Sequence, residues 1–190
     1  MRRSTAAALL MIPLLALPLA AQEHQAHEGA MDHSMHHAPA PTEGLRAELV
    51  ADIQQLEEKY LSLARAMTGR FDWRPADGVR SVGEVFGHVA DANFMIPSMA
   101  GAEREMADRR FEAEDEAGIL EGLEHSFMHA RNAIADVPDA ELDDEVTMFG
   151  QPATKRQVLT LLVTHMHEHL GQAIAYARST GVTPPWSAGS

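Results

Sequence analysis

Cysteine is absent from the 190-residue chain. Disulfide bonds, thiol catalysis and thiolate metal ligands are therefore excluded, and so is a lipid anchor attached to an N-terminal cysteine. The chain does contain 11 histidines and 11 methionines. Any chemistry of soft metals must therefore come from the imidazole and thioether side chains of these two residue types.

Positive charge is also scarce. The chain has 15 Lys and Arg residues against 28 Asp and Glu residues, which gives a formal net charge of -13. A chain with this charge repels nucleic acid and anionic lipid, so neither is an expected partner. A small-molecule substrate is the partner that we expect if the protein is an enzyme.

One apolar run, residues 6–21, follows Arg2 and Arg3 near the N-terminus. It is shorter than the roughly 20 residues that a bilayer requires, and it contains two prolines, so it does not resemble a stable membrane anchor. The order of charge, apolar core and small residues is that of a secretory signal peptide. We therefore expect a signal peptide over 1–21 and a mature protein in the periplasm or secreted, without stable membrane insertion.

The segment that follows, residues 22–44, has few branched or aromatic side chains and is predicted to be a disordered linker. It is rich in imidazole and thioether groups, which suit copper, nickel or zinc. They belong to His24, His27, His33, His36, His37, Met31 and Met35. Two interpretations stay open, a weak metal-collecting tail and a low-complexity leader that binds nothing.

Hydrophobic spacing predicts four helices in the rest of the chain. Apolar residues recur every three or four positions from Leu45 to about Gly69, and again in a stretch that ends at Pro138. Capping-box spacings that begin at Ser81 and at Thr154 predict two further helices, ending near Ile96 and Arg178. The apolar stripes of the first and third helices are Leu49, Ile53, Leu56, Tyr60 and Leu63, and Leu120, Leu123, Phe127, Ala130, Ile134 and Val137.

Four long amphipathic helices without a convincing strand pattern predict an all-α antiparallel four-helix bundle. The domain is expected to cover residues 45–180, followed by a C-terminal tail over 181–190. Between the third and fourth helices, residues 139–152 contain turn residues and are predicted to form a loop with an extended piece at 146–149.

Two histidines of the fourth helix are the strongest candidates for metal ligands. At about 100° per residue, His165 and His169 lie on one face, whereas His167 points to the opposite side. That face also carries Val158, Leu162 and Tyr176, so it should be directed to the interior of the bundle. Two buried imidazoles must either bind an ion or find separate partners.

A third ligand must come from another helix. The second helix offers His88, at the edge of the stripe formed by Val85, Val89 and Ala92. The third helix offers His125 and His129, but both point away from its apolar stripe and are predicted to face solvent. Three imidazoles leave coordination positions open for water or substrate, as in catalytic metal sites.

The fourth-helix motif also has the spacing of the inverted zinc-peptidase signature H-x-x-E-H. That signature requires a further acidic ligand downstream, and no Asp or Glu follows Glu168. The sequence therefore does not support a peptidase. Glu168 and Asp91 are kept as candidate proton handlers beside the site, although a solvent-facing charge is the simpler interpretation of Glu168.

The motif around Trp73, the segment from Val79 to Asp91 and the segment from His165 to Gln172 resemble the DinB-like family of metal-binding four-helix bundles. The resemblance covers about residues 45–180. It implies a metal site formed by His88, His165 and His169. It also implies that the relatives of this chain include thiol-dependent transferases and isomerases. Those thiol cofactors are cytoplasmic, which does not fit an exported chain.

These observations predict a metal-dependent transferase or hydrolase that binds a divalent transition metal, with zinc and nickel favoured. The alternative is a noncatalytic periplasmic protein that binds or buffers metal. A third interpretation is an ion that only holds the helices together. A homodimer formed through an exposed apolar face is a further candidate assembly.

Overall fold

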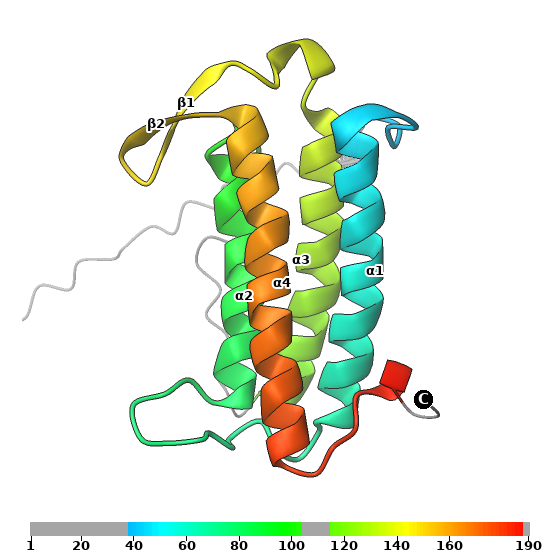
Figure 1. Ribbon diagram of the computed structural model, residues 1–190, viewed down its shortest axis with the longest axis vertical. Coiled ribbons are helices and arrows are strands. Elements are labelled where there is room, and N and C mark those ends of the chain that lie inside the picture. The colour runs from blue at the N-terminus through cyan, green and yellow to red at the C-terminus, as the bar shows by residue number, and fades with distance from the viewer. Residues whose placement is uncertain (1–37, 104–114, 188–190) are drawn as a thin grey trace, which may run out of the picture. The chain divides into compact units, whose positions relative to one another are not determined.

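The computed structural model describes residues 38–103 and 115–187, and these contain four long helices. They are α1 (Gly44–Ala66), α2 (Val82–Ser98), α3 (Glu116–Asp136) and α4 (Lys155–Ser179). Figure 1 shows them side by side in one bundle, with α1 and α4 running in one direction and α2 and α3 in the other. The predicted all-α antiparallel four-helix bundle is confirmed.

Each helix packs against two neighbours, in the order α1, α3, α2, α4 around the bundle. The centre is filled by aromatic side chains, among which Tyr60 lies 5.3 Å from Phe127 and 6.3 Å from Phe86 between ring centroids. All three are fully buried. The Tyr60 hydroxyl donates a 2.6 Å hydrogen bond to the Met166 carbonyl and so joins α1 to α4. This packing places α2 beside α4, which is the pair that carries the candidate ligands.

Both predicted capping boxes are present. Ser81 accepts a hydrogen bond from the Glu84 backbone, and Thr154 accepts one from the Gln157 backbone. Helix α2 extends past its predicted end, because Pro97 lies in its last turn, where the amides of Met99 and Ala100 bond to the carbonyls of Ile96 and Pro97. Among the described helices, none is long and apolar enough to cross a membrane.

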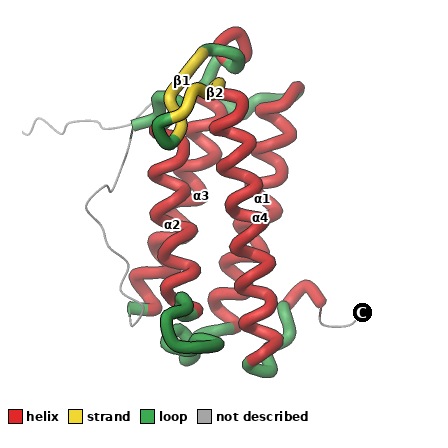
Figure 2. The backbone as a smooth tube through the Cα atoms, turned by 60° about the vertical axis from the view of Figure 1, so that its left-hand side comes forward, coloured by secondary structure: helices red, strands yellow, loops and turns green. Residues whose placement is uncertain are grey.

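A β-hairpin lies between α3 and α4, where the sequence predicted a loop with one extended piece. Strands β1 (Glu145–Met148) and β2 (Gln151–Thr154) pair antiparallel through a two-residue turn. Phe149 and Gly150 have positive φ values of 50° and 79°, as a type I′ turn requires. The second strand was missed because it is short and contains Pro152, which strands rarely tolerate. Figure 2 shows the hairpin at the end of the bundle where α4 begins.

The predicted signal peptide and most of the predicted linker lie outside the described residues. Within the described part, the Ala38 amide donates a 2.7 Å hydrogen bond to Asp136, and α1 begins at Gly44. The C-terminal segment contains a short 3₁₀ turn, Pro185–Ser187, that contacts α1.

Candidate metal centre

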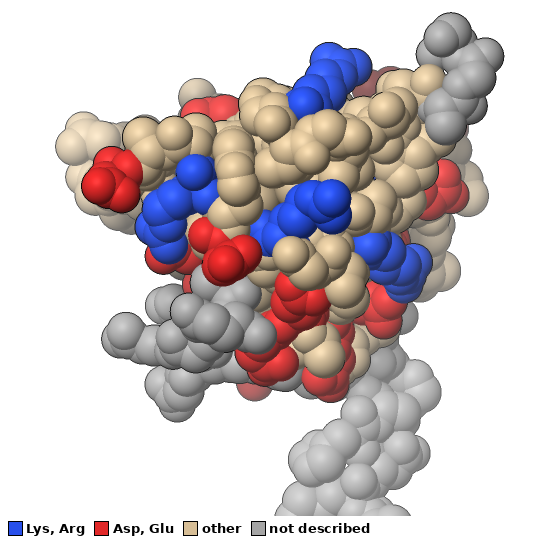
Figure 3. Space-filling model, turned by 90° about the horizontal axis from the view of Figure 1, so that it is seen from below, with Lys and Arg blue, Asp and Glu red and all other residues tan. Residues whose placement is uncertain are grey.

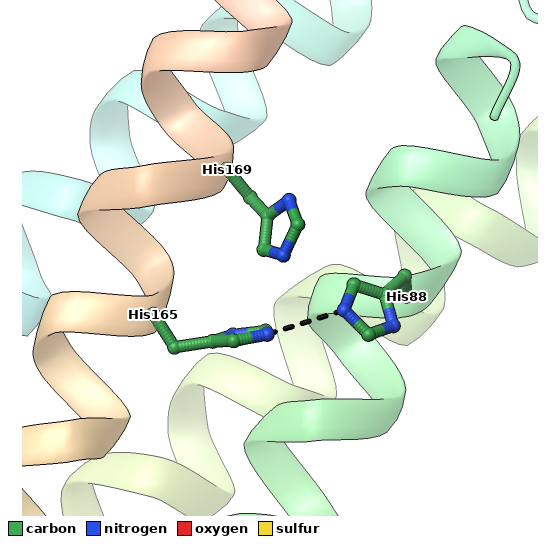
Figure 4. Close-up of side chains that lie close together, drawn as sticks. All are labelled: His88, His165 and His169. Atoms are coloured by element: carbon green, nitrogen blue, oxygen red, sulfur yellow. Dashed lines mark hydrogen bonds between the residues drawn. The ribbon is translucent and has the colours of Figure 1, made fainter. Parts of the chain in front are cut away.

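Three histidines from two neighbouring helices meet in the bundle. His88 comes from α2, and His165 and His169 come from successive turns of α4 (Figure 4). The Nε2 atoms of His88 and His165 are 3.1 Å apart. One ring nitrogen from each of the three histidines lies within 4.8 Å of the other two. The helical spacing on α4 and the packing of α2 against it therefore bring together the three residues that the sequence singled out.

The site lies at the boundary between core and solvent. His169 is 8% exposed, and His88 and His165 are half-buried. Below this surface, Val158, Leu162 and Tyr176 are buried on the same face of α4, as the sequence predicted. His167 is exposed on the other side of the helix and lies 3.0 Å from a carboxylate oxygen of Asp52. The cluster is thus supported by the core on one side and accessible on the other.

A side chain one turn further along α4 holds His169 in place. The Oε1 atom of Gln172 lies 2.8 Å from Nδ1 of His169, and Nε2 of Gln172 donates a 3.0 Å hydrogen bond to the Tyr176 hydroxyl. Because an amide oxygen only accepts, Nδ1 of His169 carries the proton and the lone pair is on Nε2. Tyr176 in turn packs against Trp73, at 5.4 Å between ring centroids. This bond between Gln172 and His169 was not predicted from the sequence.

Replacing Gln172 by alanine should weaken metal binding roughly 10–100-fold, as the loss of a partner that orients a histidine ligand usually does. Gln172→Glu should retain much of the affinity, because a carboxylate also accepts the Nδ1 proton. Titration with zinc or nickel in competition with a chromophoric chelator would measure both. Thr164→Ala, an exposed change on the same helix, serves as the control, and equal affinities for Gln172→Ala and this control would refute the assigned role.

The protein environment favours the uncharged forms of two site imidazoles, those of His88 and His165. Desolvation by burial lowers the pKa of His88 from 6.5 to about 4, with smaller contributions from the positive charges of Arg80, His169 and His165. Desolvation also lowers the pKa of His165, and the neighbouring His169 adds to the effect. Neutral imidazoles have the free lone pairs that a metal ion requires.

These pKa shifts predict a pH dependence of the metal-free protein. Between pH 6.5 and 4, the unfolded chain binds protons at His88 and His165 that the folded protein does not bind, so the free energy of unfolding falls as the pH falls. Above pH 6.5 the effect disappears. In the presence of a chelator, the melting temperature of His88→Gln should therefore fall less between pH 7 and pH 4.5 than that of the wild type, by a few degrees. If the melting temperatures of both proteins fell by the same amount, the lowered pKa of His88 would be contradicted.

The residues fit a metal ion in both geometry and chemistry. A tetrahedral ion with Zn–N distances of 2.0–2.1 Å separates two ligand nitrogens by about 3.3 Å, close to the 3.1 Å between the Nε2 atoms of His88 and His165. In addition, Nδ1 of His165 is buried and has no hydrogen-bond partner among the described residues. Either tautomer of His165 thus leaves this nitrogen without a hydrogen-bond partner, whereas Nε2 faces His88.

The two candidate proton handlers, Glu168 and Asp91, are both exposed. Glu168 precedes His169, and its negative charge acts to raise the pKa of His165. Asp91 lies one turn after His88 on α2. The carboxylate of Glu168 is thus within electrostatic reach of His165.

The two histidines of α3 differ from each other. His125 is exposed, as predicted, but the prediction for His129 was wrong, because this residue is only 7% exposed. Its ring packs against Phe94 of α2 at 5.0 Å between centroids. Helix α3 contacts both α1 and α2, so its buried arc is wider than a single apolar stripe suggests. Neither residue belongs to the three-histidine cluster.

The fold and the cluster together define a class of protein, the four-helix bundle with a three-histidine site between two helices. The family model of the DinB superfamily matches residues 52–173, more than half of the chain. The protein therefore belongs to the DinB superfamily.

Solved structures agree with this fold. A DinB-like protein from Bacillus subtilis matches with a TM-score of 0.60 and 17% identity, over 72% of this chain and 93% of that chain. A DinB-like protein from Bacillus cereus matches with the same TM-score and coverage at 22% identity. A comparison with curated proteins gave no match. At these identities the solved structures support the fold alone.

Proposed function

We propose that the protein binds one divalent transition metal ion, zinc or nickel, through His88, His165 and His169 and uses it in a transfer or hydrolysis reaction. The observation that supports this proposal is the convergence of three imidazoles from α2 and α4, with one ring nitrogen from each within 4.8 Å of the others. Three protein ligands leave room for water or substrate in the coordination shell.

A bound divalent ion in such a site acidifies a water molecule or polarises a substrate oxygen. The protein's own contribution is to orient the histidine ligands and to exclude water from one side of the site. Gln172 fixes the tautomer of His169, and the packed core beneath the cluster closes one side of it to solvent. Glu168, exposed beside His165, is the group that we assign to proton transfer, and Asp91 is the second candidate.

We also propose that the protein acts outside the cytoplasm, in the periplasm or as a secreted protein, on a small-molecule substrate. The support is the order of charged, apolar and small residues over 1–21, which is typical of a signal peptide. Cell fractionation, with the intact mass of the recovered protein, would test this. A mass that corresponds to cleavage near Ala21 is expected, and an uncleaved cytoplasmic protein would contradict export. The homodimer stays a prediction.

Metal analysis and turnover together test the proposed function. The purified protein should contain about one zinc or nickel ion per chain by mass spectrometry, and hydrolysis or transfer in a substrate panel should stop in the presence of a chelator. Deletion of residues 22–41 should leave turnover unchanged. If that deletion instead removes most of the bound metal and the full chain shows no turnover, the noncatalytic buffering function is the correct one.

A further inference from the structure

Tyr176 lies one turn after Gln172 on α4, and its hydroxyl is the second partner of the Gln172 amide. The Oε1 atom of this amide lies 2.8 Å from Nδ1 of His169, and the Nε2 atom donates a 3.0 Å hydrogen bond to the Tyr176 hydroxyl. An amide has one accepting end and one donating end, and these two contacts use both. Spacings of three and four residues therefore connect His169, Gln172 and Tyr176 in one chain of hydrogen bonds along the helix.

The ring of Tyr176 is held by a contact with another element. It meets the ring of Trp73 edge-on, with 5.4 Å between the centroids and 74° between the planes. The Trp73 carbonyl in turn accepts a 2.9 Å hydrogen bond from the amide of Val82, in the first turn of α2. The Tyr176 hydroxyl therefore has a position that is fixed relative to both α4 and the start of α2, the helix that carries His88.

This chain of hydrogen bonds is largely shielded from solvent. Figure 3 views the bundle from the end where α4 stops, and it shows several Lys and Arg side chains on that surface, with acidic side chains to one side. Tyr176 is only 7% exposed, His169 is buried as well, and Gln172 is half-buried. Water therefore has limited access to the two hydrogen bonds, and the loss of one of them is not readily made up by solvent.

The direction of the chain decides which nitrogen of His169 is open to a metal ion. As observed, Oε1 of Gln172 faces Nδ1 of His169, so Nδ1 carries the proton and Nε2 of the ring keeps its lone pair. If the amide turned around, it would donate to Nδ1, and the ring proton would move to the nitrogen that an ion needs. A phenol hydroxyl both donates and accepts, so Tyr176 can bond to either end of the amide. It holds Gln172 in line with His169 in both arrangements, and an ion on the ring Nε2 selects the observed one.

We propose that Tyr176 is a positioning residue of the metal site, because its hydroxyl keeps the Gln172 amide in line with His169 so that the metal-binding tautomer forms without a rearrangement of side chains. This proposal rests on the proposed function, because it concerns a ligand of that same site. Tyr176 acts through Gln172 rather than on the ion. Without the hydroxyl, one end of the amide loses its partner, and the Gln172 side chain is free to adopt other rotamers.

The experiment compares zinc binding by the full chain of the wild type, of Tyr176→Phe and of the control Tyr60→Phe. Tyr176→Phe keeps the ring that packs on Trp73 and removes only the hydroxyl. Tyr60→Phe also removes a buried hydroxyl that bonds to α4, but at the Met166 carbonyl. Titration against a chromophoric chelator should show a roughly three- to tenfold weaker zinc affinity for Tyr176→Phe, as expected for one lost hydrogen bond, and a change of less than about twofold for Tyr60→Phe.

The combination with Gln172→Ala tests whether Tyr176 acts through the amide. In the Gln172→Ala background, Tyr176→Phe should weaken zinc binding by less than roughly twofold, because the amide that the hydroxyl holds is already gone. If Tyr176→Phe has its full effect in that background, or if the wild type and Tyr176→Phe bind zinc equally well, the proposal is overturned.

Nitrogen-15 NMR of the imidazole rings gives a readout that a change of stability alone does not move. In the zinc-loaded protein, the Nδ1 proton of His169 should exchange with water faster in Tyr176→Phe than in the wild type or in Tyr60→Phe, and equal exchange in all three would contradict the positioning role. Failure of the wild type to bind zinc would instead refute the proposed function. In that case the metal-free protein decides: a His169 tautomer ratio that differs between the wild type and Tyr176→Phe would support the positioning role, and an equal ratio would overturn it.

Discussion

Replacement of His165 by alanine is expected to reduce the metal content from about one ion per chain to less than roughly a tenth of that value. All three rings of the cluster contact one another, and that of His165 lies 5.0 Å from that of His88 and 4.5 Å from that of His169 between centroids. Loss of an orienting partner alone costs 10–100-fold in metal affinity, and loss of a direct ligand should cost at least as much. Mass spectrometry after removal of loosely bound ions would measure the content.

The chain offers a matched control for this change. His167 is on the same helix, two residues further, but it is exposed and lies beside Asp52 rather than in the cluster. His167→Ala should keep its metal, whereas His88→Ala and His169→Ala should lose it. His129→Ala tests the buried histidine of α3. Loss of metal from His129→Ala together with its retention by His88→Ala would show that the site is assigned to the wrong residues.

The parts of this site that could be predicted from the sequence are those that depend on the geometry of a single helix. A spacing of four residues places His165 and His169 on one face of α4 whatever the rest of the fold does, and the buried Leu162 and Tyr176 indicate that this face is internal. The contribution of His88 is different. Its place at the edge of an apolar stripe did not show which helix it meets, and the family resemblance was needed to pair it with α4.

The errors arose where the environment of a residue is set by two neighbouring elements. His129 lies off the main apolar stripe of α3, yet it is buried because α2 covers it with Phe94. The bond of Gln172 to His169 depends on the rotamers of both side chains, which spacing alone does not determine.

Removal of the metal is expected to lower the melting temperature of the wild type by roughly 5–10 °C. An ion bound by His88 and by the two histidines of α4 would connect two helices that are otherwise held by side-chain packing, and it would bind the folded chain only. At a free metal concentration of 100 times the dissociation constant, this binding stabilises the folded state by about 2.7 kcal/mol. For a domain of this size each kcal/mol shifts the melting temperature by about 2–4 °C.

Thermal melts at pH 7, with zinc or nickel added and then with a chelator in excess, would measure this shift. His88→Ala is the informative comparison, because it leaves α4 intact and removes the only ligand on α2. The melting temperature of this variant should not respond to metal, and it should lie near that of the chelated wild type. An equal response of both proteins would place the stabilising ion elsewhere. A different outcome is that the wild type unfolds at room temperature on chelation and shows no turnover in the presence of metal. That outcome would establish a structural ion that holds α2 against α4.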